Sequence, residues 1–215
     1  MSYSLIIFDW DGTLIDSAGT IVECIQQASA ELGLEVPDRS RASHVIGLGL
    51  QDSLRLAVPG LPAERYAEFV ELYRKHFLER EDAIRLFPGI EALLKTLSQT
   101  RLLAIATGKS RRGLERALQA TGLKAYFSAS RCADETTPKP APAMLQEIIE
   151  ELSTPVEHAL MIGDTSHDIE MARGAGIDAL AVTYGAHPEP ALRACGPRGC
   201  VSSVTALTEW LERNA

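Results

Sequence analysis

The sequence predicts an α/β fold: a doubly wound parallel sheet with a Rossmann-like core and an inserted helical cap subdomain. First, strand-like and helix-like segments alternate from Pro88 onward, which is typical of a parallel sheet with helices on both faces. Second, the apolar run Leu5–Phe8 is typical of a buried strand. Third, the block 15–85 contains no convincing strand pattern. We therefore expect residues 1–14 and 86–215 to form the core and residues 15–85 to form a helical cap.

The inserted block contains two long amphipathic patterns. Apolar residues at helical spacing predict a first helix that starts near residue 17 and ends near Gly33. Pro62 opens a second helix, from residue 63 to about 81, which carries an aromatic face. The intervening stretch, 39–60, contains a Gly-Leu-Gly turn signal and a short apolar run.

After the insertion, each predicted strand is a short apolar run and each predicted helix has an amphipathic spacing. Tyr126 and Phe127 give only a weak, short strand. The expected elements are helix 90–97, strand 102–106, helix 110–121, the weak strand 126–127, helix 142–152, strand 159–162, helix 168–175, strand 179–182 and a terminal helix 204–213.

Composition excludes several classes of protein. The chain of 215 residues is 46% hydrophobic and 23% charged, which is ordinary for a globular protein, and its formal net charge of −8 disfavours nucleic acid as a partner. No apolar stretch approaches the roughly 20 residues needed to span a bilayer, and no basic segment precedes the first apolar run. We expect a cytoplasmic protein with no membrane partner. Cys195 and Cys200 lack a second pair of zinc ligands, so reduced thiols are expected.

An acidic cluster follows the first predicted strand. Asp9 and Asp11, one residue apart and followed by Gly12 and Thr13, stand at the strand's carboxyl end. Ligands of open α/β sheets bind at that edge. Two buried carboxylates repel one another unless a cation, a shared proton or hydrogen-bond donors compensate them. We therefore expect a positive charge at this position.

Three further polar signals follow later strands of the predicted sheet. Thr107 and Gly108 offer a hydroxyl and backbone amides to an anionic oxygen. The simpler interpretation of Thr107 is that it caps the next helix, a role that Ser110 could fill equally well. Asp164 and Asp168 lie four residues apart, so both can approach one point. Capping of the next helix explains one of these aspartates but not both.

Lys139 lies between two prolines, which restrict its backbone and give its ammonium group a defined direction. An isolated lysine is usually a solvated surface residue. In combination, however, the four aspartates are expected to surround Mg²⁺, a hard cation that prefers carboxylates and water. Lys139 and Thr107 would then bind the oxygens of a substrate, which predicts a phosphoryl-transfer site.

The chain resembles the haloacid dehalogenase-like hydrolases, specifically the phosphoglycolate phosphatase-like branch with a helical cap. The resemblance rests on Asp9-Trp10-Asp11-Gly12-Thr13, Thr107-Gly108, Lys139-Pro140, and Gly163-Asp164 with Asp168, in the family's order. Gly47-Leu48-Gly49 and Phe87-Pro88-Gly89 also look like that branch.

The resemblance implies a role for each matched residue. Asp9 would attack phosphorus and become a transient aspartyl phosphate, and Asp11 would protonate the leaving alcohol and later activate water. The metal would be held by Asp9, Asp164 and the backbone carbonyl of Asp11. Asp168 would act through a water or by orienting its neighbours, and Thr107, the Gly108 amide and Lys139 would hold the phosphoryl oxygens. Because the dehalogenating members lack an acid at the place of Asp11, dehalogenation is disfavoured.

Specificity is expected to come from the cap, in the loop that contains His44, Gly47, Gly49 and Gln51. Arg41 and Arg55 flank this loop and could meet a substrate carboxylate, although solvent-facing arginines are the simpler interpretation. His44 and His167 are tempting proton-transfer groups, but Asp11 already fills that role. We expect both histidines to be surface or supporting residues.

The predicted activity is Mg²⁺-dependent hydrolysis of a small phosphorylated metabolite, such as phosphoglycolate or a sugar phosphate. A phosphomutase or a pyrophosphatase on the same scaffold would use the same nucleophile and metal. A protein that binds a phosphorylated ligand without catalysis is an alternative of another class. The expected partner is a small phosphate ester, and the chain is expected to be a monomer or a weak homodimer.

Overall fold

The computed structural model describes residues 3–214 and contains a six-stranded parallel sheet with strand order β3-β2-β1-β4-β5-β6. The chain starts in the middle of the sheet, adds β2 and β3 on one side, and then returns to add β4, β5 and β6 on the other, so the predicted doubly wound α/β fold is confirmed. The strands are Leu5–Phe8 (β1), Leu102–Thr107 (β2), Ala129–Cys132 (β3), Ala159–Gly163 (β4), Asp178–Val182 (β5) and Gly199–Val201 (β6).

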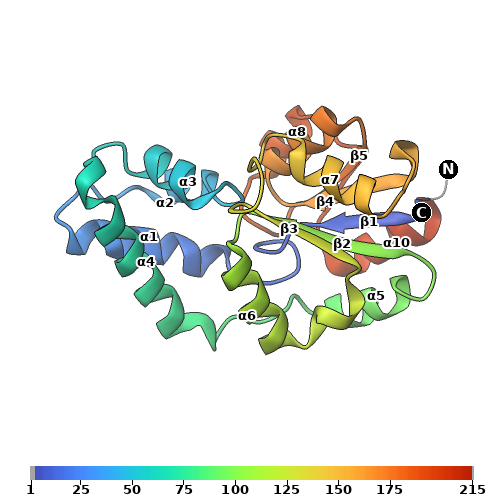
Figure 1. Cartoon of the computed structure of the whole chain (residues 1–215), viewed down its shortest axis with the longest axis horizontal. Coiled ribbons are helices and arrows are strands. Elements are labelled where there is room, and N and C mark those ends of the chain that lie inside the picture. Colours follow the sequence, from blue (N-terminus) through green and yellow to red (C-terminus); the bar gives the residue numbers. More distant parts are fainter. Residues whose placement is uncertain (1–2, 215) are drawn as a thin grey trace.

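Helices cover both faces of the sheet (Figure 1). They are α5 (Ile90–Leu97), α6 (Arg111–Thr121) and α10 (Val204–Asn214) on one face, and α7 (Ala143–Glu151), α8 (Ser166–Ala175) and α9 (Glu189–Ala194) on the other. The short 3₁₀ helices η2 (Leu123–Tyr126) and η3 (Val156–His158) precede β3 and β4.

The side chains of β1 show why both faces are covered. Ile6 and Phe8 belong to the hydrophobic cluster with α5, α6 and α10, whereas Leu5 and Ile7 belong to the cluster with α7, α8 and α9. Successive residues of a strand point to opposite faces, so a continuous apolar run requires cover on both. All four side chains are fully buried, which places the end of β1 at the centre of the molecule.

Four helices between β1 and α5 form a helical lobe, defined here as residues 18–81, at the left of Figure 1. They gather around a third hydrophobic cluster of their own. No strand occurs in this lobe. Its elements are α1 (Ala18–Glu31), α2 (Arg39–His44), α3 (Leu50–Ala57), the 3₁₀ helix η1 (Ala63–Arg65) and α4 (Tyr66–Glu81).

One predicted strand is wrong, and several short elements, among them α2 and α3 of the helical lobe, were not predicted. Tyr126 ends the 3₁₀ helix η2, and the edge strand β3 follows at Ala129–Cys132, where Ala104 of β2 pairs with Ala129. Tyr126 and Phe127 instead pack as partly buried side chains against the first hydrophobic cluster. The short elements α9 and β6 have no counterpart in the prediction. Within residues 3–214, no helix has the length and apolar character needed to cross a bilayer.

Candidate active site

Asp9 follows the last residue of β1, and its backbone N–H continues the sheet by donating to the Ile162 carbonyl at 2.9 Å. Its side chain is buried beside the ammonium group of Lys139. The Lys139 Nζ atom lies 2.7 Å from Oδ1 of Asp9 and 2.6 Å from Oδ1 of Asp168, and the lysine side chain is fully buried. The predicted direction of Lys139 therefore has a concrete form: its ammonium bridges two carboxylates inside the protein.

Asp164 directly follows the neighbouring strand, β4, and both of its carboxylate oxygens accept hydrogen bonds. The Thr13 hydroxyl donates to Oδ1 at 2.7 Å, and the Ala186 backbone N–H donates to Oδ2 at 2.7 Å. Gly12 has a φ of +80°, and a Cβ at that position would lie 2.2 Å from Asp164 Oδ2. Only glycine satisfies both the left-handed backbone and this close approach.

Asp168 lies in the first turn of α8 and takes part in its N-terminal cap. The Thr165 hydroxyl and backbone N–H donate to Oδ2 of Asp168 at 2.7 and 3.1 Å, in a capping box. The other oxygen, Oδ1, faces Lys139. Asp168 thus caps the helix and positions the lysine at the same time.

The charges of this group do not balance. Burial, with added repulsion from Asp168 and Asp164, raises the pKa of Asp9 well above its usual range, against the opposing effect of Lys139. Burial and the Asp168 charge raise the pKa of Asp164 to about 7. The two flanking carboxylates hold the pKa of Lys139 above its ordinary value despite its burial. Three buried carboxylates face one ammonium group, so a proton or a further cation is required.

The donor set fits a hard cation. Oxygen atoms of Asp9, Asp164 and Asp168 lie within 4.8 Å of one another. Oδ2 of Asp9 is buried and has no hydrogen-bond donor among residues 3–214. Carboxylate oxygens suit Mg²⁺, whereas no cysteine or histidine nitrogen joins this cluster as a softer ligand would.

Asp11 lies two residues after Asp9, and two residues contact its side chain. The Lys109 ammonium lies 2.9 and 3.0 Å from its two oxygens, and the Ser17 hydroxyl donates to Oδ1 at 2.7 Å. Lys109 also lies 4.8 Å from the centroid of the Phe77 ring in α4, so it joins the acidic loop to the helical lobe.

Thr107 and Gly108 end β2 beside this group. Thr107 is fully buried, and its hydroxyl accepts from the Lys109 backbone N–H at 3.2 Å. The N-cap of α6 is Ser110, whose hydroxyl accepts from the Gly113 N–H at 3.3 Å. Capping of α6 therefore does not explain Thr107, the alternative that the sequence left open.

The loop from Gly47 to Gly49 in the helical lobe lies directly on the core. A Cβ at Gly108 would lie 2.5 Å from the Gly47 carbonyl oxygen and 2.6 Å from that of Leu48. Gly47, Gly49 and Gln51 also line the cleft that contains Asp9 and Asp11. The flanking Arg41 and Arg55 are absent from its described lining, and Arg41 instead pairs with Glu35 at 3.0 Å.

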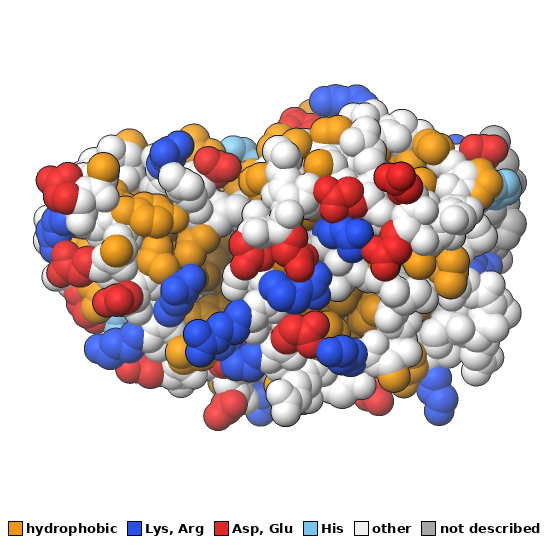
Figure 2. Space-filling view, in the orientation of Figure 1, with side chains coloured by type: hydrophobic (Ala, Val, Ile, Leu, Met, Phe, Trp, Pro, Cys, Tyr) orange, Lys and Arg blue, Asp and Glu red, His pale blue; other side chains and the backbone are white. Residues whose placement is uncertain are grey.

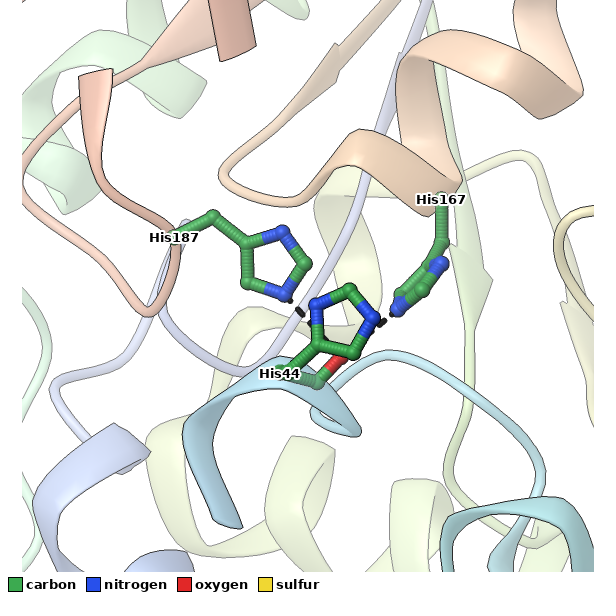
Figure 3. Close-up of side chains that lie close together, drawn as sticks. All are labelled: His44, His167 and His187. Carbon is green, nitrogen blue, oxygen red and sulfur yellow. Dashed lines mark hydrogen bonds between the residues drawn. The ribbon is translucent and has the colours of Figure 1, made fainter. Parts of the chain in front are cut away.

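His44 is an exposed residue at the end of α2, outside the lining of the cleft, but its backbone carbonyl joins the lobe to the core. Nε2 of His167, in α8, lies 2.8 Å from this oxygen, and Nε2 of His187, after β5, lies 3.1 Å from it (Figure 3). A carbonyl only accepts, so both Nε2 atoms donate. Nδ1 of His187 in turn accepts from the Ser166 N–H at 3.1 Å.

These contacts explain the three-histidine cluster. Burial lowers the pKa of His187 to about 4 and also lowers the pKa of His167, so both rings are neutral at pH 7. The hydrogen bond that Nδ1 of His187 accepts requires a neutral ring at that residue. The nitrogens of the three rings lie within 4.8 Å of one another, but His187 already uses both of its nitrogens. We therefore interpret the cluster as a structural contact, in which His167 and His187 of the core hydrogen-bond to the backbone of the helical lobe.

The site thus contains residues that the sequence did not single out. Lys109 directly follows the Thr107-Gly108 motif, but spacing does not reveal that its side chain turns back to Asp11. Thr13 likewise belongs to the acidic motif and holds Asp164. His187 had no sequence signal, because it follows a strand in a loop without a recognisable pattern.

Comparison with known proteins decides the family. Residues 6–182 match the family model described as haloacid dehalogenase-like hydrolase. The chain belongs to the haloacid dehalogenase-like hydrolases. The predicted family, including its phosphoglycolate phosphatase-like branch, is therefore confirmed.

Relatives of this hydrolase match it over nearly their whole length. A probable phosphatase, IndB, from Dickeya dadantii (strain 3937) is 35% identical, over 94% of this chain and 91% of that protein. A phosphoglycolate phosphatase from Agrobacterium fabrum (strain C58 / ATCC 33970) is 30% identical, over 96% of this chain and 91% of that protein. The crystal structure of a predicted phosphatase from Clostridium acetobutylicum covers 99% of this chain and 100% of that chain, with 26% identity and a TM-score of 0.87.

Proposed function

We propose that this phosphoric monoester hydrolase is a Mg²⁺-dependent phosphatase that acts on a small phosphorylated metabolite through an aspartyl-phosphate intermediate. The observation that carries the proposal is the position of Asp9: a carboxylate at the end of the central strand, with one buried oxygen lacking a donor, beside Asp164, Asp168 and Lys139. A nucleophile, a cation site and a fixed ammonium are what phosphoryl transfer to a carboxylate requires.

In this proposal Asp9 attacks phosphorus, and the bond between phosphorus and the alcohol oxygen breaks. Asp9, Asp164 and the Asp11 carbonyl would hold Mg²⁺, which reduces the repulsion between the anionic nucleophile and the phosphoryl oxygens when it is bound. Lys139, the Thr107 hydroxyl and the Gly108 amide would bind those oxygens. The burial of Thr107 and its freedom from helix capping support this role.

Asp11 would move the protons. As an acid it would give a proton to the leaving alcohol oxygen, and as a base it would take one from the water that then attacks the aspartyl phosphate. The bond between phosphorus and Asp9 breaks, which releases orthophosphate and restores the Asp9 carboxylate. The hydrogen bonds from Ser17 and Lys109 fix the Asp11 side chain and support this assignment.

The helical lobe would serve as the cap, with the loop around Gly47, Gly49 and Gln51 facing the substrate. Close contact of Gly47 with Gly108 and Thr165 supports this arrangement. A phosphomutase or a pyrophosphatase would use the same nucleophile, so the released product distinguishes them: orthophosphate and an alcohol, an isomerised sugar phosphate, or two orthophosphates. A non-catalytic phosphate-binding protein would release none of these.

The test compares the wild type with Asp9→Asn, using p-nitrophenyl phosphate and Mg²⁺. We expect Asp9→Asn to abolish hydrolysis, because an amide does not replace the attacking carboxylate. Asp16→Asn is the matched control: it makes the same chemical change at an exposed position of the same loop and is expected to keep wild-type activity. Hydrolysis that survives in Asp9→Asn would rule out the proposed nucleophile.

A further inference from the structure

A cleft of about 900 Å³ extends from Asp9 and Asp11 outward between the helical lobe and the core. Figure 2 shows this hollow near the centre of the molecule, with hydrophobic side chains inside it and Lys and Arg side chains gathered along its lower rim. Ligand pockets of roughly 300–1,000 Å³ hold molecules of drug size. A two-carbon ester such as phosphoglycolate would leave most of this cleft filled with water.

The wall on the side of the lobe is apolar. Buried or partly buried side chains of α1, α3 and α4 line it: Ile21, Ile25, Leu54, Val70, Tyr73 and Phe77. A sugar or a hydroxy acid presents hydroxyl groups that would lose their hydrogen bonds to water against such a wall. An apolar or aromatic group would instead gain from its removal from water.

Four cationic residues also line the cleft, and two of them are already paired. Lys109 holds Asp11, and Arg116 Nε lies 2.7 Å from Glu81. Arg74 in α4 and Arg112 in α6 have no ion pair and no hydrogen bond from their side chains within residues 3–214. These two arginines therefore present free guanidinium groups from opposite sides, one from the lobe and one from the core.

Besides Asp9 and Asp11, the cleft has two acidic lining residues, Asp52 and Asp134. Asp134 accepts the Arg111 backbone N–H at 2.8 Å and so caps α6, and Asp52 lies exposed in the first turn of α3. One oxygen of Asp134 is thus used at the start of α6, and neither Asp52 nor Asp134 forms an ion pair with Arg74 or Arg112 within residues 3–214. Guanidinium groups bind carboxylates and phosphates through paired hydrogen bonds.

We propose that the substrate is a phosphate monoester whose alcohol part carries an apolar, aromatic-sized body and a second anionic group, which Arg74 and Arg112 bind. The apolar wall holds the body, and the arginines hold the second anion, away from the reacting phosphoryl group. This substrate class rests on the proposed phosphatase function and narrows it.

The test measures kcat and KM with Mg²⁺ for a matched set of aryl phosphates. The set consists of phenyl and naphthyl phosphate, each unsubstituted, with a carboxylate, with a phosphonate, and with the neutral methyl ester of the carboxylate. Glycolate 2-phosphate is the small reference. We expect the kcat/KM of the wild type to be about tenfold or more higher for naphthyl phosphate than for glycolate 2-phosphate, because the apolar wall binds the ring. We expect kcat/KM to be about tenfold or more higher for an ester with a carboxylate than for its methyl ester, which corresponds to one charged hydrogen bond. The carboxylate and phosphonate arms identify which anion binds better.

Arg74→Gln and Arg112→Gln should each raise KM for the anion-bearing esters about tenfold. For the unsubstituted esters, kcat/KM of both variants should stay within about twofold of the wild-type value. Arg55→Gln, at an exposed arginine of α3 outside the cleft lining, is the matched control and should change neither. Equal rates for the anionic and neutral esters, or equal losses for both in the arginine variants, would overturn the substrate class while the phosphatase stands. No hydrolysis of any ester by the wild type would overturn both proposals.

Discussion

Asp11 and Lys109 form an ion pair next to the acidic loop. The ammonium contacts both carboxylate oxygens, and both side chains are nearly buried, with 13% of Lys109 and 11% of Asp11 exposed. A pair in this environment is screened less by water and salt than one on the surface. Lys109 therefore holds Asp11 in one orientation between turnovers.

Asp11→Asn should lower kcat by about 10²–10⁴-fold for an alkyl phosphate, because the amide gives no proton to the leaving alcohol. For p-nitrophenyl phosphate, the rate of the step that forms the aspartyl phosphate should fall much less, because its leaving group needs no proton. Burst kinetics with both substrates measure this split. Equal losses in that step for the two substrates would contradict the role of Asp11 as the acid.

Lys139 is a buried cation between two buried carboxylates. Lys139→Met should remove activity and lower the free energy of unfolding by about 3–5 kcal/mol at neutral pH, since it leaves these carboxylates without their partner. Urea-induced unfolding measures the change. Lys124→Met, at a lysine of 71% exposure that pairs with Glu115, is the control and should cost less than about 1 kcal/mol. Similar losses in the two variants would contradict this account.

Among single residues, the sequence was most informative where position along a strand determines the site. Asp9 and Asp164 directly follow the adjacent strands β1 and β4, so their convergence follows from the predicted sheet. The partner of Asp11 could not be predicted in this way, because Lys109 reaches it through a long flexible side chain whose direction depends on packing against Phe77. Side-chain reach is a tertiary property that spacing does not encode.

At the scale of elements, α2 is fastened to the core through its last carbonyl. His167 and His187 converge on this oxygen from α8 and from the loop after β5. The Gly47–Gly49 loop, which follows α2 directly, contacts Gly108 and Pro138 of the core. The two histidines thus set the position of the loop that faces the cleft.

His167→Ala and His187→Ala should each raise KM severalfold, because loss of one hydrogen bond to the His44 carbonyl costs about 0.5–1.5 kcal/mol and loosens the loop. Substitution by Asn or Gln, which keeps an N–H donor, should restore part of the loss. His44→Ala is the matched control: it removes a neighbouring ring but keeps the backbone carbonyl, so KM should stay close to the wild-type value. A larger effect at His44 than at His187 would contradict this account.

The elements that the sequence predicted well are those with a strong local pattern. Leu5–Phe8 and Ala159–Gly163 are continuous apolar runs because both of their faces are covered. The edge strand Ala129–Cys132 includes Ser130 and Arg131, which are only partly buried, so its composition resembles a loop. The strand Gly199–Val201 is a three-residue edge strand, and its identity comes from pairing with β5 rather than from its own residues.

At the scale of the molecule, the groups of the proposed active site come from parts of the chain that are far apart in sequence. The pairing of β1 with β2 and β4 brings the acidic loop, Thr107 and Asp164 to one edge of the sheet. The repulsion among these carboxylates opposes the folded state, and a bound divalent cation would relieve it. Metal binding and global stability should therefore be coupled.

Saturating Mg²⁺, at about 100 times its dissociation constant, should stabilise the protein by about 2.7 kcal/mol and raise Tm by about 5–10 °C. EDTA should reverse the shift, as measured by differential scanning calorimetry. Asp164→Asn should weaken the response, whereas Asp178→Asn, at a partly exposed carboxylate that pairs with Arg198, should keep it. An equal rise in Tm in wild type and Asp164→Asn would argue against the proposed metal position.

The central place of β1 has a consequence for the order in which the site can assemble. Asp9 and Asp164 lie far apart in the sequence, yet they follow two adjacent strands of the sheet. Contacts between distant segments cost more loop-closure entropy than local ones, so the pairing of β1 with β4 is slow relative to the formation of the helices. We therefore expect the carboxylates to come together late in folding, once that long-range contact has formed.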